Sequence, residues 1–232
     1  MPEFRFLEEP PQEKIEELLE IIEETEIKPR LIFPFILNTE RWEVMKMIMS
    51  KETNLERILE FLNNEDFVIR EAGLYLLRQI PKFSDKDLEI ILPILERMSN
   101  EGDTTFKEAL IKTLSHLGEK ALPILKKMKK NLAVKDKIIL ALGRIGRIEE
   151  EALSILLKEM RESEEIWIKI AVARALGFAG EKALSHLKAI IETEEIWEVK
   201  EAAIKSLGMI GGKEALEILK EMRRYELSLL KP

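Results

Sequence analysis

The chain has 232 residues, of which 46% are hydrophobic and 35% are charged, and its net charge is −7. It contains no cysteine and only two histidines, which excludes disulfides and thiolate zinc sites and leaves too few imidazoles for a histidine-based metal cage. We therefore expect a protein without a metal or cofactor. The abundance of glutamate and lysine gives a thermophile-like composition.

Residues 1–65 are the least regular part of the sequence. The chain begins with acidic residues and prolines where a signal peptide needs a basic start, and no stretch approaches the roughly 20 apolar residues of a membrane span. We therefore expect a soluble, cytoplasmic protein. A glutamate-rich amphipathic pattern over residues 13–24 predicts an N-terminal capping helix, with an acidic partner-binding tail as the alternative. We predict a cap and a diverged helical repeat over residues 1–65, followed by one continuous repeat array over 66–232.

From residue 67 onward two helical patterns alternate. The first pattern is followed by L-G-x-x-G or a weaker copy of it, and the closing glycines recur at intervals of 28 to 34 residues, as in stacked helix pairs. We expect the first helix of each pair over residues 67–77, 105–114, 133–142, 167–176 and 198–207. We expect the second helix over residues 88–98, 119–128, 150–160, 181–190 and 213–222. We call these the A helices and the B helices.

Helix-capping signals in the sequence support these helical hairpins. Thr53 with Glu56, and Ser84 with Asp87, have the spacing of N-terminal capping boxes. The closing glycines, which we expect to be left-handed C-caps, are Gly118, Gly146, Gly180 and Gly211. A second set lies inside the A helices, where recurrence indicates close helix packing, and comprises Gly143, Gly177 and Gly208.

The strings VIREAG, ALG or SLG, and E-K-A-L-x-x-L resemble HEAT repeats, specifically the short variety also found in phycocyanobilin lyase subunits. The resemblance covers residues 66 to about 222 and implies an all-α fold, an α-α superhelix or solenoid, which we expect to hold about six helical hairpins. It also implies that the A helices line the concave face, and that basic residues and the mostly acidic residues four positions before them form a ladder between repeats. The basic positions would be Arg70, Lys107, Lys135, Lys169 and Lys200.

The same register predicts which A-helix residues face outward. Two rows are uniformly apolar and predict the core, whereas neighbouring rows mix cations with aromatic and apolar side chains, which is typical of a groove for an acidic or amphipathic peptide. A solvated face with ion pairs within each helix is the alternative. From the outward rows we select as candidate partner-binding residues Tyr75, Lys112, His116, Arg144, Arg174, Phe178, Lys205 and Met209.

We therefore predict a non-catalytic scaffold or adaptor that binds a partner protein or peptide in its concave groove, and self-association through an imperfect cap stays open. Nucleic-acid or phosphate-ligand binding is the first alternative, because residues 67–147 carry 16 basic and 10 acidic side chains, including a lysine cluster at 126–130. A lyase-like enzyme subunit is the second. We expect no catalytic or metal site, since neither histidine belongs to the His-Glu dipeptides of HEAT-like hydroxylases. Trp167 and Trp197 lie where hydrophobic staples are expected.

Overall fold

The computed structural model describes Met47 and residues 54–229. The chain divides into two compact units, residues 1–98 and 99–232, and each is described by itself. The helices among residues 54–98 of the first unit are α4 (Leu55–Leu62), α5 (Phe67–Leu77) and α6 (Asp85–Met98). The predicted capping helix over residues 13–24 lies outside the described residues, and the predicted division at residue 65 stays a prediction.

The second unit consists of alternating A and B helices. The A helices are α7 (Thr104–Leu117), α9 (Lys135–Gly146), α11 (Ile166–Ala179) and α13 (Trp197–Ile210). The B helices are α8 (Leu122–Met128), α10 (Glu150–Glu162), α12 (Leu184–Thr193) and α14 (Gly212–Leu229). Short 3-10 turns precede α8, α9 and α12 and span Gly118–Ala121, Leu132–Val134 and Gly180–Ala183. The part of the chain that the structure describes has no strand, so the predicted all-α array of helical hairpins is confirmed there.

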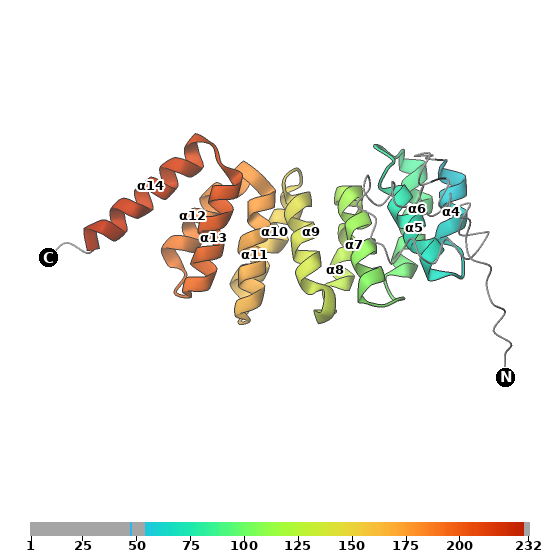
Figure 1. Cartoon of the computed structure of the whole chain (residues 1–232), viewed down its shortest axis with the longest axis horizontal. Helices are drawn as coiled ribbons and strands as arrows, with labels where there is room; N and C mark the ends of the chain where they lie inside the picture. Colours follow the sequence, from blue (N-terminus) through green and yellow to red (C-terminus); the bar gives the residue numbers. More distant parts are fainter. Residues whose placement is uncertain (1–46, 48–53, 230–232) are drawn as a thin grey trace, which may run out of the picture. The chain divides into compact units, whose positions relative to one another are not determined.

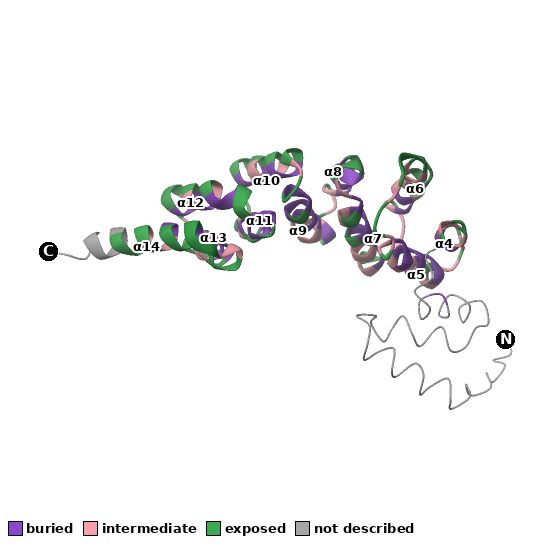
Figure 2. Ribbon diagram, turned by 90° about the horizontal axis from the view of Figure 1, so that it is seen from above, coloured by how far each residue is buried: buried purple, intermediate pink, exposed green. Residues whose placement is uncertain are grey.

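The second unit has two rows of helices (Figures 1 and 2). The A helices α9, α11 and α13 pack side by side, and the B helices α8, α10 and α12 form the other row. Buried side chains lie between the rows. In every A helix of this unit the leucine before or within the L-G-x-x-G segment is a core residue, as the apolar rows predict. These leucines are at most 2% exposed and are Leu114, Leu142, Leu176 and Leu207.

Two of the three glycines inside the A helices confirm the predicted close packing. A Cβ atom at Gly143 would lie 2.2 Å from the carbonyl oxygen of Ala175 in α11. A Cβ atom at Gly177 would lie 2.4 Å from the terminal methyl of Met209 and 3.0 Å from the Ser206 side chain, both in α13. The Ser206 hydroxyl donates a buried hydrogen bond of 2.8 Å to the Ala173 carbonyl of α11. The helices α9, α11 and α13 therefore approach one another through positions that lack a side chain or have a small one.

The prediction is wrong for Gly208, because nothing lies within 4 Å of the place where its Cβ would be. This position belongs to α13, which no further A helix follows among the described residues. Leu216 in α14 is likewise less covered than its equivalents: it is 50% exposed, whereas the register-equivalent Leu153 and Leu184 are 4% and 3% exposed. The last hairpin therefore exposes positions that the next hairpin covers elsewhere in the array.

The closing glycines differ from the expectation. Gly118, Gly180 and Gly211 have positive φ angles of 66°, 74° and 68°, but their ψ angles of −137°, −147° and −157° place them outside the left-handed helical region. Gly146 is the last residue of α9 itself, and Arg147 follows with a helical φ of −60°, so the prediction of a left-handed cap is wrong there.

Two further expectations about helix starts have different outcomes. The capping box at Ser84 and Asp87 is confirmed, because the Asp87 backbone N–H donates to the Ser84 hydroxyl at 3.2 Å and the Ser84 backbone N–H donates to the Asp87 carboxylate at 2.8 Å. The Ser84 hydroxyl also donates to this carboxylate at 2.7 Å, and together with the bond from the Ser84 N–H it holds the pKa of the Asp87 carboxyl below its ordinary value. The predicted cap at Thr53 is wrong, since α4 begins at Leu55 and the Asn54 side chain accepts the Arg57 N–H at 3.2 Å.

Two residues of the predicted basic ladder form ion pairs, but with partners other than the predicted ones. Lys135 pairs with Glu159 of α10 at 2.6 Å, and Lys169 pairs with Glu194 at the end of α12 at 3.0 Å. The polar residues four positions earlier instead cap helix starts: the Asp103 carboxylate, for example, accepts the Phe106 N–H at 2.8 Å. These two basic residues therefore join the A and B helices of one hairpin.

Candidate functional site

Exposure along the outer face of the A helices increases toward their C-terminal ends. At the register position of Glu108 and Glu201 the residue is half-buried in every described A helix, whereas two turns later, at the position of Phe178 and Met209, the residue is exposed in every described A helix. Seven of the eight candidate residues are exposed, and Tyr75 is half-buried. The face predicted from the register is therefore open to a ligand, most of all where the A helices end.

A groove of about 710 Å³ lies at the C-terminal ends of α11 and α13. Two of the candidate residues line it, together with the turn that follows α11. The full lining is Arg147, Gly177, Phe178, Ala179, Gly180, Glu181, Lys182, Met209 and Ile210. We call this feature the groove.

The groove owes its shape to two glycines. Because Gly177 has no side chain, the Met209 methyl group reaches over the α11 backbone and forms part of the apolar wall. Gly180, with its φ of 74°, reverses the chain after α11 in a conformation that residues with a Cβ rarely adopt. The Lys182 ammonium then holds the turn in place by bonding the Ile148 carbonyl at 2.9 Å and the Glu150 carboxylate at 2.9 Å.

One arginine lines the groove, and a second contacts one of the lining side chains. The Arg144 guanidinium of α9 lies over the Phe178 ring, 5.5 Å from its centroid. Arg147 is exposed, and no carboxylate of a described residue forms an ion pair with it. Phe178 and Met209 are 37% and 52% exposed, so the apolar wall of the groove is accessible to a ligand. The groove thus combines an apolar wall with the Arg147 guanidinium, and its lining also includes the exposed Glu181.

The structure does not bring the remaining candidates into this groove. Lys112 and Arg174 are exposed on α7 and α11, and His116 is exposed near the end of α7. Lys205 pairs with Glu201 one turn earlier at 2.7 Å, as the alternative of a solvated face expects. Tyr75 belongs to the other unit, where the Arg78 guanidinium lies 5.4 Å from its ring centroid.

Sequence reasoning missed Arg147, Lys182 and Ile210. The register comparison covered helix faces, whereas Arg147 and Lys182 lie in the segments that connect A helices to B helices. For Lys182 the sequence held a usable signal, because a lysine follows a glutamate in two of these connections, at residues 119–120 and 181–182. Ile210 is half-buried, whereas the register-equivalent Ala179 and Ile145 are 1% and 3% exposed.

The lysine cluster at 126–130 is partly neutralised. Lys126 pairs with Glu151, and Lys129 pairs with Glu159 at 2.6 Å. Glu159 is 9% exposed and also binds Lys135, so one buried carboxylate joins α8, α9 and α10. Burial raises the pKa of this carboxyl, but the bonds from the two lysines outweigh it and hold the pKa below its ordinary value. The cluster therefore presents less free positive charge than its sequence indicates.

Within residues 54–229 and at Met47, no three histidine, aspartate or glutamate side chains converge as a metal site requires. None of the helices in this part of the chain has the length and apolar character needed to cross a membrane.

Comparisons with known proteins identify the repeats. A family model described as HEAT repeats matches residues 153–227, which include the groove residues of α11 and α13. The crystal structure of an engineered protein, a target of the Northeast Structural Genomics Consortium, is 16% identical, with a TM-score of 0.41 over 74% of this chain and 86% of that one. No curated protein sequence matches the chain.

Proposed function

Residues 153–227 belong to the HEAT-repeat family, and from that premise we propose that the chain is a non-catalytic scaffold that binds a segment of a partner protein in the groove. HEAT repeats generally serve as scaffolds for protein–protein interaction, because stacked hairpins present long continuous surfaces. The partner segment is acidic and partly apolar.

One observation carries this proposal: exposed apolar side chains and unpaired cations occur together at the groove. Phe178 and Met209 would bury a leucine, phenylalanine or similar side chain of the partner. The Arg147 guanidinium would bind an adjacent carboxylate, and Arg144, already over the Phe178 ring, would bind another. A nucleic acid is a poorer match, because Lys126 and Lys129 are already paired with glutamates.

A peptide-library selection tests the proposal. Peptides of about twelve residues selected on the wild-type protein would be labelled, and their affinities measured by fluorescence anisotropy. We expect acidic residues beside large apolar ones in the selected peptides, and about a hundredfold weaker binding to a Phe178→Asp/Met209→Asp double variant.

Ile90→Asp is the matched control, because Ile90 is 52% exposed, as Met209 is, but lies in α6 of the other unit. Its affinity for the peptides is expected to equal that of the wild type. Selected peptides that bind the double variant as tightly as the wild type would rule out the groove as their site.

A further inference from the structure

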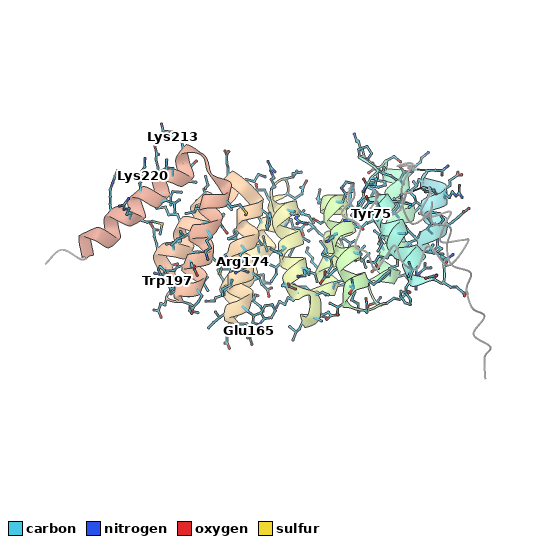
Figure 3. All side chains as sticks on the ribbon, viewed as in Figure 1. Tyr75, Glu165, Arg174, Trp197, Lys213 and Lys220 are labelled. Atoms are coloured by element: carbon cyan, nitrogen blue, oxygen red, sulfur yellow. The ribbon has the colours of Figure 1, made fainter. Side chains whose placement is uncertain are left out.

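A second surface lies at the opposite ends of the A helices, where α9, α11 and α13 begin. Leu132, Ile166 and Trp197 occupy the same register position in three successive hairpins and are 69%, 47% and 60% exposed. Trp167, next to Ile166, is 42% exposed. Glu165 and Trp197 lie along one edge of the second unit, at the bottom of the view in Figure 3. We call these four apolar residues, with the glutamates among them, the A-helix edge.

The two tryptophans do not act as the predicted hydrophobic staples. A staple residue precedes the helix cap and packs against the first turn. Trp197 is instead the first residue of α13 and Trp167 the second residue of α11, and both side chains are open to solvent. Single exposed apolar residues are ordinary, but a row of them at one repeat position marks an interaction surface. Tryptophan is also among the residues that contribute most to binding energy at interfaces.

Charge defines the kind of partner. Four exposed glutamates flank the α11 and α13 residues of this row in the sequence, and no lysine or arginine in the described residues pairs with them; they are Glu164, Glu165, Glu195 and Glu198. Glu194 shows the contrast, since its carboxylate accepts from Lys169 at 3.0 Å and from the Glu195 backbone N–H at 3.0 Å. The edge therefore offers apolar contacts and free negative charge together.

We propose that the A-helix edge binds a basic amphipathic segment of a protein partner. Aliphatic side chains of that segment pack on Ile166 and the tryptophans, while its lysines and arginines pair with the glutamates. A cation over the face of an exposed tryptophan adds a further attraction. A membrane surface does not match, because anionic headgroups repel the same carboxylates. The groove selects the opposite charge, so the two sites recognise different segments.

Binding of synthetic peptides to the full chain tests this inference. The probe is a peptide of about fifteen lysines and leucines in an amphipathic helical pattern, and the comparison peptides are its glutamate–leucine counterpart and an oligolysine of equal length. Isothermal titration measures affinity, and tryptophan emission reports burial of the edge. We expect the lysine–leucine peptide to bind at least about tenfold more tightly than either comparison peptide.

Two edge variants and one control separate specific binding from general attraction to an acidic protein. Trp167→Ala/Trp197→Ala and Glu165→Lys/Glu195→Lys should each weaken binding by about tenfold or more. Glu119→Lys/Glu214→Lys makes the same change in net charge at exposed sites away from the edge and should have little effect. All of these positions are exposed, so far-ultraviolet circular dichroism should show an unchanged fold.

Three outcomes would overturn the proposal: absence of binding by the lysine–leucine peptide, equal binding by oligolysine, or equal weakening by the edge and control charge variants. Sedimentation of the protein with vesicles of phosphatidylcholine and phosphatidylserine, lost in the tryptophan variant, would overturn it in favour of a lipid surface. The groove variant Phe178→Asp/Met209→Asp should bind the lysine–leucine peptide as the wild type does, which keeps this test separate from that of the groove.

Discussion

The carbonyl oxygen of Ala175 in α11 occupies the space that a side chain at Gly143 of α9 would need, because the two sites are 2.2 Å apart. The neighbour at this position is backbone, so it cannot rotate away as a flexible side chain can. Gly143→Ala would therefore have to separate two A helices. We expect it to lower the free energy of unfolding by about 2 kcal/mol, despite the higher helix propensity of alanine.

Gly208→Ala is the matched comparison. It makes the same substitution at the equivalent position of α13, where nothing lies within 4 Å of the new Cβ atom. Only the gain in helix propensity remains, so we expect the stability to rise by up to about 1 kcal/mol. Urea denaturation of both variants measures the contrast, and equal losses of stability would show that Gly143 is not a packing site.

A second register-matched pair tests whether the last hairpin is less covered than the others. Leu153 of α10 is 4% exposed and Leu216 of α14 is 50% exposed. We expect Leu153→Ala to cost about 3 kcal/mol, because it leaves a cavity, and Leu216→Ala to cost less than about 1 kcal/mol. Thermal denaturation of the two variants gives the comparison, and a large loss for Leu216→Ala would mean that α14 packs more tightly than described.

The carboxylate of Glu159 gives a prediction about pH. Its folded-state pKa lies below the ordinary value of 4.5, so its contribution to stability is complete above that pH and is lost as the pH falls through the lower folded value. We expect Glu159→Gln to be about 2 kcal/mol less stable than the wild type at neutral pH, because two lysines lose a charged acceptor.

As the pH falls through this lowered folded-state pKa, the wild-type carboxyl is itself protonated, so the difference between the two proteins should shrink. Guanidinium denaturation at pH 7 and at an acidic pH measures both values. Glu162→Gln, at an exposed residue of the same helix that pairs with Lys158 at 3.8 Å, is the control and should change stability little at either pH. A gap for Glu159→Gln that stays constant with pH would contradict the assigned ionisation.

The repeat architecture could be predicted because it depends on period and pattern. The interval between closing glycines and the apolar rows of the A helices place α7, α9, α11 and α13 within a few residues of their observed bounds. Glycine conformation could not be predicted in this way. Gly146 and Gly180 are equivalent in sequence, yet α9 includes the first whereas α11 ends before the second.

The groove was only partly predictable for a related reason. Phe178 and Met209 follow from helix periodicity, which fixes the outward direction of a side chain. Arg147 and Lys182 lie in connecting segments, whose course depends on the turn after each A helix. The partners of Lys135 and Lys169 were mistaken because a spacing of four residues within one helix start does not show which helix lies alongside it.

The most direct test of the scaffold proposal is a nuclease-treated pull-down from native lysate, read by mass spectrometry, with wild-type protein, Phe178→Asp/Met209→Asp and the control Ile90→Asp as baits. The proposal predicts at least one protein that the wild type and Ile90→Asp retain and that the groove variant loses. The same proteins on all three baits, or capture that nuclease abolishes, would contradict binding of a protein partner in the groove.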